Sequence, residues 1–419
     1  MGARLPGVES EDRIVAHADM DCFYASCERL REPALRGEPL VVGMGYEPGE
    51  TVGAVATASY EARAFGVESA QAITEALERL PRKRVAATDP DLDVEAAGFY
   101  RPVDMAFYES VSEEVREILH AHAGTVREVS IDEAYLDVTE ETTWDEAEDF
   151  ARGIKDRIER EVGVVASIGV APNMSTAKIA SDAEKPDGLV VVEPEAVREF
   201  LAPVPVEDLH GVGPVTARTL RDRGIETAGH LAGAERHALV SEFGERGADL
   251  YDRARGVDDR VVTPKGRPKS LSRESAFADP TGDLGAVEER ALTLAAAVSE
   301  RAIRKDALYR TIGIKVVTPP FDVNTRARSL PGPVDDPELV GRVVRELLSE
   351  FEGERVRKVG VRVSNLEFGS AAQASLDGWA GSEDVVDGSS SEGEEDGPEA
   401  ESSTDRAEGS GQASLSQFE

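Results

Sequence analysis

The fourteen residues VREVSIDEAYLDVT, at positions 126–139, constrain the fold more than any other stretch. Their alternating apolar side chains predict a β-strand over residues 126–138, yet two adjacent acids, Asp132 and Glu133, interrupt it. Adjacent strand residues point to opposite faces, so at most one of these acids can face an apolar core. Because an unpaired buried carboxylate is costly, either the strand is an exposed edge or something cationic lies beside it.

A third acid, Asp19, ends another predicted strand, the short apolar run at residues 14–19. If this strand lies beside residues 126–138, three carboxylates converge and repel one another unless divalent cations neutralise them. Ligands that are all oxygen suit hard ions such as Mg²⁺. Two such ions ~3.5–4 Å apart can clamp the attacking and leaving oxygens of a phosphoryl transfer.

Predicted strands and helices interleave up to about residue 185, which indicates an α/β unit. Residues 206–256 have the character of helices separated by glycines. Residues 257–268 have the composition of a linker. Strands and helices alternate again from residue 269 to residue 368. In this last part we expect helices at 287–304 and 337–351, and strands at 311–318, 324–329 and 358–366.

The chain of 419 residues carries 47 basic and 82 acidic side chains, a net charge of −35, and only 9 of the basic residues are lysines. This composition resembles that of a halophile's cytosolic protein; an acidic mesophilic protein is the alternative. No apolar run approaches the ~20 residues of a membrane span, and the first residues lack the apolar segment of a signal peptide. We therefore expect a soluble, cytoplasmic protein with no membrane partner. Cys22 and Cys27 form neither a disulfide framework nor a zinc motif.

The charge is distributed unevenly along the chain. Residues 264–368 carry 18 basic and 16 acidic side chains, whereas residues 1–263 have a net charge of −25 and residues 369–419 one of −12. The first of these segments therefore has the relative charge of a nucleic-acid-binding surface, although scattered arginines are the alternative. From residue 369 onward Gly, Ser, Asp and Glu dominate, and we expect disorder there.

Four stretches complete the pattern: ADMDCFYASCE from residue 18, AVATASYEARAFGV from 54, SIDEAYLDV from 130 and SIGVAPNMSTAKIASDAEKPDG from 167. Together, and in this order, they resemble the Y-family DNA polymerases, closely the DinB-like branch. The resemblance covers residues 12–366, and the four motifs together are far more specific than any one of them. It implies an α+β multidomain fold, a right-hand polymerase with palm, fingers, helical thumb and α/β little finger. It also implies low-fidelity, DNA-directed DNA synthesis across damaged template.

The resemblance assigns the catalytic site by position. Asp19, Asp132 and Glu133 match the catalytic, metal-binding carboxylates, and Met20 matches the residue that lends a backbone carbonyl to a metal. Two Mg²⁺ ions per active site are implied, and the primer 3′-OH attacks the α-phosphorus of a dNTP with pyrophosphate leaving.

Nucleotide contacts follow in the same way. Tyr24 matches the steric gate, whose ring occupies the space that a ribose 2′-OH would need, and Phe23 lies beneath the incoming sugar. A polyphosphate is bound by arginine forks, a lysine charge and hydroxyl donors, and the matching groups are Thr57, Tyr60, Arg63 and Lys178. Ordinary half-buried aromatics and a surface arginine are the structural alternative. Cys22 departs from the aromatic residue common at its position.

Primer-template DNA and a sliding clamp are the further partners that the resemblance implies. Gly211 and Gly213 match a helix-hairpin-helix turn, which presents backbone N–H groups to a DNA phosphate. The final QASLSQF resembles a clamp-binding (PCNA) peptide, with Gln412, Leu415 and Phe418 as its anchors. A near-copy at residues 373–379 could serve the same purpose or end the folded domain.

We therefore expect a monomer divided into six parts. These are the palm at 1–22 and 86–185, the fingers at 23–85, the thumb at 186–256, a linker at 257–268, the little finger at 269–368 and the acidic tail at 369–419. A nucleotidyl cyclase also uses a carboxylate-bearing palm but needs no thumb turn, little finger or clamp peptide. A non-catalytic DNA-binding recruitment protein is the second alternative, and the intact acids argue against it.

Overall fold

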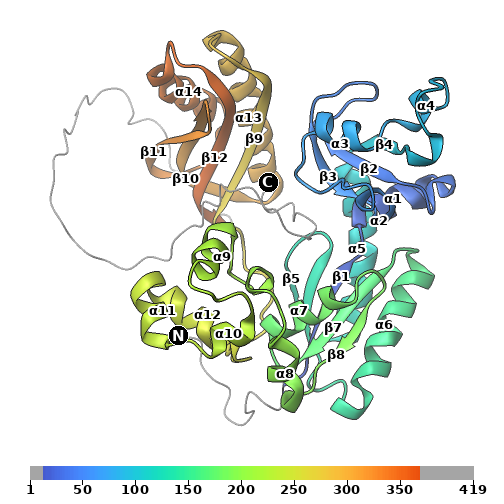
Figure 1. Ribbon diagram of the computed structural model, residues 1–419. Coiled ribbons are helices and arrows are strands. Elements are labelled where there is room, and N and C mark those ends of the chain that lie inside the picture. The colour runs from blue at the N-terminus through green and yellow to red at the C-terminus, as the bar shows by residue number, and fades with distance from the viewer. Residues whose placement is uncertain (1–12, 369–419) are drawn as a thin grey trace. The chain divides into compact units, whose positions relative to one another are not determined.

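The computed structural model describes residues 13–368 of the chain (Figure 1). It forms two compact units, with the boundary between residues 265 and 266. Residues 373–379 and 412–418, the two predicted clamp peptides, lie outside the described residues. No helix within residues 13–368 is long and apolar enough to cross a membrane.

A five-stranded sheet at the centre of the first unit has the order β5-β6-β1-β7-β8. Its middle strand pairs antiparallel with both neighbours, β6 and β7, while β7 and β8 are parallel. Every residue of the middle strand is buried, as expected of a strand covered on both faces. The strands are β1 (Val15–Met20), β5 (Thr125–Glu128), β6 (Glu133–Asp137), β7 (Ala166–Ala171) and β8 (Leu189–Val191).

The side chains of β1 alternate between its two faces, so the two faces contact different elements. Ala16, Ala18 and Met20 join the core formed with α5 (Met105–His122) and α6 (Ala147–Glu161). Val15 and Asp19 lie on the opposite face, where α7 (Met174–Ala183) packs on β1 and β7. Asp19 therefore faces α7, and the apolar side chains on the other face of β1 pack against α5 and α6.

The prediction of one strand over residues 126–138 is wrong. The segment is a hairpin in which β5 and β6 pair antiparallel, with Glu128 opposite Ala134. The acids therefore lie at the turn and not in mid-strand, which avoids burying a carboxylate in the middle of a strand. Asp132 is in the turn itself, and Glu133 is the first residue of β6.

A second, three-stranded sheet of the order β3-β2-β4 lies in the segment that we expected to include the fingers. In it, β4 (Phe99–Pro102) pairs parallel with β2 (Leu40–Met44), so this sheet continues beyond residue 85, the expected end of the fingers. Their apolar core is closed by short helices. The remaining elements are β3 (Ala54–Ala58), α1 (Phe23–Arg31), α2 (Tyr60–Arg63), α3 (Ile73–Arg79) and α4 (Lys83–Ala86).

The segment expected as the thumb is helical, as its glycine-punctuated sequence predicts. Apolar side chains of its helices continue the core on the α7 side of the first sheet. Its helices are α8 (Val197–Leu201), α9 (Pro214–Arg221), α10 (Ala228–Ala232), α11 (Arg236–Phe243) and α12 (Glu245–Ala254).

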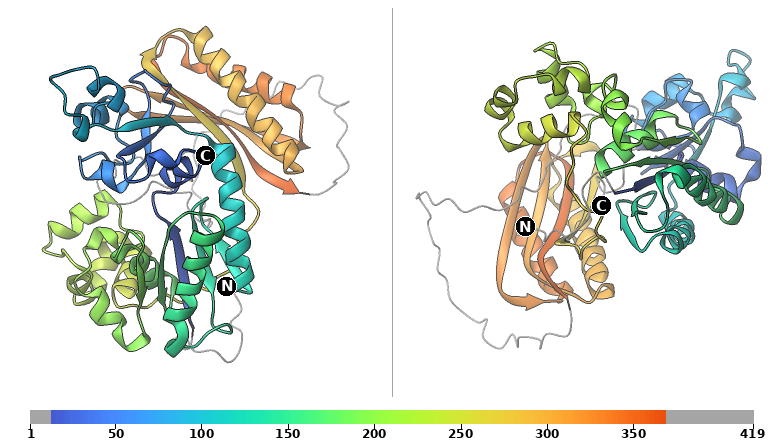
Figure 2. Two further views of the ribbon diagram at one scale, coloured as in Figure 1. Left: turned by 90° about the vertical axis from the view of Figure 1, so that its right-hand side faces the viewer. Right: turned by 90° about the horizontal axis from the view of Figure 1, so that it is seen from below.

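The second unit is an antiparallel sheet of the order β11-β10-β12-β9. Two helices, α13 (Leu284–Arg304) and α14 (Pro337–Leu348), lie side by side on one face of it (Figure 2). Sequence patterns did not predict β9, because charged residues interrupt its apolar alternation and much of it is exposed. The strands are β9 (Ser270–Thr281), β10 (Ala307–Thr318), β11 (Asp322–Val334) and β12 (Val356–Phe368).

Gly169 of β7 lets α7 lie unusually close to the sheet. A Cβ atom at this position would be 2.2 Å from both the carbonyl oxygen of Ala177 and the backbone nitrogen of Ser181. These are backbone atoms, so they cannot rotate away as a side chain could. Only glycine therefore permits the observed distance between α7 and β7.

We predict that Gly169→Ala lowers the free energy of unfolding by at least ~2 kcal/mol, because it forces two backbones apart. Chemical denaturation followed by tryptophan fluorescence measures this. Gly153→Ala is the matched control, since Gly153 lies in α6 with no atom within 4 Å of the added Cβ. That substitution should stabilise by up to ~1 kcal/mol. Equal effects of the two variants would contradict this account of α7.

Candidate active site

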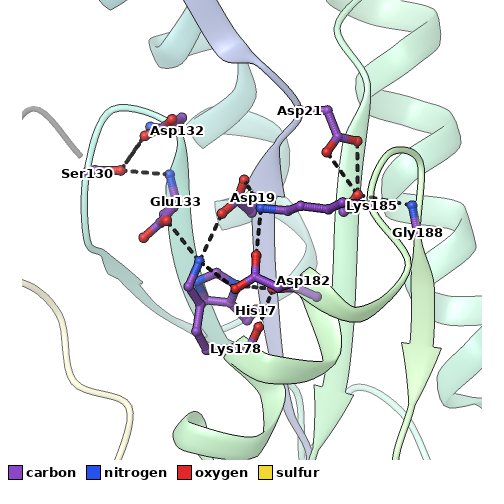
Figure 3. A network of polar contacts seen from close by, with 12 residues as sticks. His17, Asp19, Asp21, Ser130, Asp132, Glu133, Lys178, Asp182, Lys185 and Gly188 are labelled. Atoms are coloured by element: carbon purple, nitrogen blue, oxygen red, sulfur yellow. Dashed lines mark hydrogen bonds and ion pairs between the residues drawn. The ribbon is translucent and has the colours of Figure 1, made fainter. Parts of the chain in front are cut away.

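Three carboxylates gather where β1 ends and the β5–β6 turn begins (Figure 3). Asp19 lies opposite Glu133 in the register of the two strands. The backbone N–H of Met20 donates to the carbonyl oxygen of Asp132 at 3.0 Å, which fixes the turn against the end of β1. The structure therefore brings Asp19 next to the pair of Asp132 and Glu133, which lies more than a hundred residues further along the sequence.

Ser130 gives the turn its shape. Its hydroxyl oxygen accepts from the backbone N–H groups of Asp132 and Glu133, at 3.3 and 3.1 Å. The same hydroxyl donates to the carboxylate of Asp132. This local pattern satisfies two turn N–H groups and explains why a serine precedes the acidic pair.

Two lysines supply the positive charge that the sequence led us to expect. Lys178, on α7, places its Nζ 3.1 Å from Oδ2 of Asp19 and 3.0 Å from Oε1 of Glu133. Lys185, just after α7, places its Nζ 2.6 Å from Oδ1 of Asp19 and 2.8 Å from a carboxylate oxygen of Asp182. Asp19 thus has a cation on each carboxylate oxygen.

The charge is balanced on only one side of the cluster. Burial alone would raise the pKa of Asp19, but Lys178 and Lys185 outweigh burial and lower that pKa well below its ordinary value. Burial and the neighbouring Asp19 raise the pKa of Asp132 to about 6. Burial also raises the pKa of Glu133 to about 7, against the opposing charge of Lys178. The Asp132 side therefore lacks positive charge.

The donor set fits a hard divalent cation in its chemistry. Its side-chain ligands are carboxylate oxygens, which Mg²⁺ prefers, and the raised pKa values of Asp132 and Glu133 show that additional positive charge would be stabilised there. Within residues 13–368, however, no three acidic, histidine or cysteine side chains are gathered closely enough to enclose an ion. The lysines hold Asp19 and Glu133 instead.

Asp21 is a buried acid that sequence reasoning missed. It accepts from the hydroxyl of Ser167 at 2.9 Å, the backbone N–H of Asp187 at 2.8 Å and the hydroxyl of Tyr60 at 3.0 Å. These donors belong to β7, to the loop after α7 and to α2 of the fingers. Asp21 therefore connects three segments that are distant in the sequence, and only the fold reveals it.

The predicted nucleotide contacts lie on the fingers and on α7. Phe23 and Tyr24 begin α1 and are buried, and Thr57 is buried on β3 with no hydrogen-bond partner for its hydroxyl among the described residues. On α2 the guanidinium of Arg63 lies 4.7 Å from the centre of the Tyr60 ring. The bond from Tyr60 to Asp21 brings this helix to the end of β1, next to the acids.

The predicted DNA-binding glycines lie in the thumb segment, apart from this cluster in the sequence. Gly211 has a φ of +90°, a left-handed conformation that favours glycine, and Gly213 caps the start of α9. Arg253 donates to the carbonyl oxygen of His210 at 2.8 Å and Arg246 donates to that of Gly211. Two arginines of α12 therefore hold the turn that precedes α9.

Comparison with known proteins identifies the family. Residues 18–182 match the model of the impB/mucB/samB family, residues 194–225 match the IMS family HHH motif, and residues 268–376 match the impB/mucB/samB family C-terminal domain. The DNA polymerase IV of Halobacterium salinarum is 66% identical over 383 residues, which cover 91% of this chain and 92% of the relative.

Solved structures agree with these matches. A Y-family DNA polymerase chimera of Dbh and Dpo4 is similar with a TM-score of 0.73 and 29% identity, over 85% of this chain and 100% of that one. An insertion ternary complex of Dbh DNA polymerase is similar with a TM-score of 0.59 and 27% identity, over the same shares.

The chain therefore belongs to the impB/mucB/samB family, the Y-family DNA polymerases. The predictions of a multidomain polymerase fold and of an enzyme with DNA-directed DNA polymerase activity are confirmed. DNA polymerase activity excludes both alternatives, the nucleotidyl cyclase and the non-catalytic recruitment protein.

We predict that Asp21→Ala lowers the free energy of unfolding by roughly 2–5 kcal/mol, because it leaves buried donors on three segments without an acceptor. Chemical denaturation of the full chain measures the change. Asp156→Ala, an exposed acid on α6, is the control and should stay within ~0.5 kcal/mol of the parent protein. A similarly small effect at Asp21 would mean that it does not join these segments.

Proposed function

We propose that this polymerase extends a primer on template DNA by two-metal nucleotidyl transfer from a dNTP, with a tolerance for damaged template. The observation that carries the proposal is the cluster of Asp19, Asp132 and Glu133 at the end of β1, with Lys178 beside it (Figure 3). The ternary complex of a Dbh polymerase among the similar structures supports binding of DNA and nucleotide together. The Halobacterium relative and the net charge of −35 support a halophilic source.

Asp19, Asp132, Glu133 and the backbone carbonyl of Met20 would hold the two Mg²⁺ ions. Bound there, the ions would supply a lowered pKa for the primer 3′-OH and a counter-charge for the triphosphate. Asp19 is already ionised, since two lysines lower its pKa. For the acids to act as ligands, Lys178 and Lys185 have to release the carboxylate oxygens that they contact.

Once it has released the carboxylates, Lys178 can bind the phosphates of the nucleotide. Donors of the kinds that bind phosphate oxygens are its Nζ, the Arg63 guanidinium, the Tyr60 hydroxyl and the Thr57 hydroxyl. The Thr57 hydroxyl has no hydrogen-bond partner within residues 13–368. Tyr60 exchanges its bond with Asp21 for such a contact in this proposal. Phe23 would support the sugar, and Tyr24 would exclude a ribose by volume.

Contacts to DNA are assigned to the later segments. The turn at Gly211 and Gly213 would bind a backbone phosphate through the N–H groups at the start of α9. Residues 269–368 would hold the duplex through arginines and lysines, in line with their nearly balanced charge in a strongly acidic chain. The chain would act as a monomer, and Gln412, Leu415 and Phe418 would bind a sliding clamp.

We predict that Asp132→Asn and Glu133→Gln each lower the rate of dNTP incorporation at least about a hundredfold, the scale expected when transition-state charge stabilisation is lost. Both changes keep the shape of the side chain and remove its charge. Glu128→Gln, on the same hairpin but paired with Arg116 and His120, should retain activity. Primer extension in Mg²⁺ measures all three, and near-normal extension by either acid variant would exclude the two-metal assignment.

We predict that deletion of residues 410–419 leaves unassisted primer extension unchanged and removes its stimulation by a sliding clamp. At ~2 M KCl the Debye length is shorter than the ~3 Å reached at ~1 M, and the counterion-release contribution to phosphate binding shrinks. The apolar contacts of Leu415 and Phe418 do not weaken in the same way, so the difference should be largest there. Deletion of residues 390–399, an acidic segment of equal length, is the control. Equal stimulation of both deletions would direct attention to residues 373–379.

A further inference from the structure

The ring of Tyr24 rests against a second aromatic ring. It stacks on Tyr108 of α5 with 4.7 Å between ring centres and an angle of 16° between planes. Tyr24 is 3% exposed and Tyr108 is fully buried. Near-parallel rings at this distance make van der Waals contact over a wide area, so Tyr108 closes one face of the space available to Tyr24.

The opposite end of Tyr108 is also fixed. Its hydroxyl donates to Oε1 of Glu28 at 2.7 Å, and burial raises the pKa of that hydroxyl far above its ordinary value, so it stays a donor. Glu28 is 3% exposed and lies four residues after Tyr24 on α1, hence on the same face of the helix. Tyr24 and Glu28 therefore hold one tyrosine at its ring and at its hydroxyl.

The two helices that carry these residues are themselves joined. Arg31 of α1 pairs with Asp104 at 2.7 Å, and its guanidinium lies 4.2 Å from the centre of the Phe107 ring. Asp104 in turn caps α5 by accepting from the backbone N–H of Phe107. The position of Tyr108 relative to α1 is therefore set by contacts on both sides of it.

We propose that Tyr108, held by Glu28, is a positioning residue for sugar discrimination. It keeps the ring of Tyr24 from moving away when a ribose 2′-OH would clash with that ring. A steric barrier works only if it cannot move, and a ring that lost its support could rotate or shift into the vacated volume. This proposal rests on the proposed role of Tyr24. It adds that the selectivity of the gate depends on a residue that does not touch the nucleotide.

The test is single-nucleotide primer extension by the full-length protein, with kcat/KM measured for a dNTP and for the matching rNTP. Their ratio does not depend on the fraction of folded enzyme, since both values come from the same preparation. Tyr108→Leu should lower the dNTP preference about tenfold, a change of ~1.4 kcal/mol in differential transition-state free energy. The loss should come from improved rNTP use, with the dNTP value less affected. Tyr108→Phe keeps the stacked ring but loses the bond to Glu28, so it should lower the preference by only about threefold.

Two reference variants make the result interpretable. Tyr24→Ala removes the gate itself; if it leaves the preference unchanged, the proposed role of Tyr24 fails and this inference fails with it. If Tyr24→Ala lowers the preference and Tyr108→Leu does not, only the present inference is overturned. Tyr100→Leu removes another buried tyrosine of the fingers, whose hydroxyl bonds to Leu80, and an equal loss there would also overturn it.

A variant at Glu28 covers the case in which Tyr108→Leu does not fold. Glu28→Ala leaves the tyrosine ring in place and removes the acceptor that holds its hydroxyl. It should lower the dNTP preference by about threefold, since one neutral-to-charged hydrogen bond is lost. An unchanged preference in this variant would overturn the proposal.

Discussion

The double ion pair at Asp19 is the interaction on which the site depends. β1 is buried along its whole length, so a carboxylate at its end has to be neutralised from within the protein or by a ligand. Lys178 and Lys185 do this in the structure, one on each oxygen of Asp19. Both lysines come from α7 and the residues just after it, and the packing of α7 on β1 and β7 is what gives them their reach. Asp19, Glu133 and the helix that carries Lys178 therefore form one electrostatic unit.

The elements of the fold could largely be predicted from hydrophobic periodicity, but the connections between them could not. The 126–138 segment shows why. Its apolar alternation continues through the turn, and only the pairing of Glu128 with Ala134 shows that the chain reverses. β4 is a similar case, since its place in the fingers depends on a parallel partner almost sixty residues earlier. β9 was missed because its charged residues hide its alternation.

The residues of the candidate site also fall into two groups, those that the sequence indicated and those that only the tertiary structure identified. Asp132 and Glu133 are conspicuous in the sequence because they are two acids in an apolar context, and Asp19 is conspicuous because it ends an apolar run. The motif resemblance added Lys178. Lys185 and Asp21 lie within two of the quoted stretches and Tyr108 lies in none of them, and sequence reasoning assigned no role to any of the three. Each acquires a role only through a partner far along the chain: Asp19, Tyr60 and Tyr24 respectively. Contacts of this kind depend on tertiary structure, and no periodicity encodes them.

The close approach of α7 to Gly169 has a consequence for how this protein can change. Backbone atoms, and not side chains, set the distance between α7 and the sheet. Repacking the apolar core on the opposite side of the sheet, among α5, α6 and the alternate residues of β1, therefore does not change that distance directly. The turn that carries Asp132 is different, because two side chains of α5 donate to the carbonyl oxygens of Ser130 and Ile131. Substitutions in the core around α5 would therefore move this turn and its acid, whereas the helix that carries Lys178 would keep its distance from the sheet.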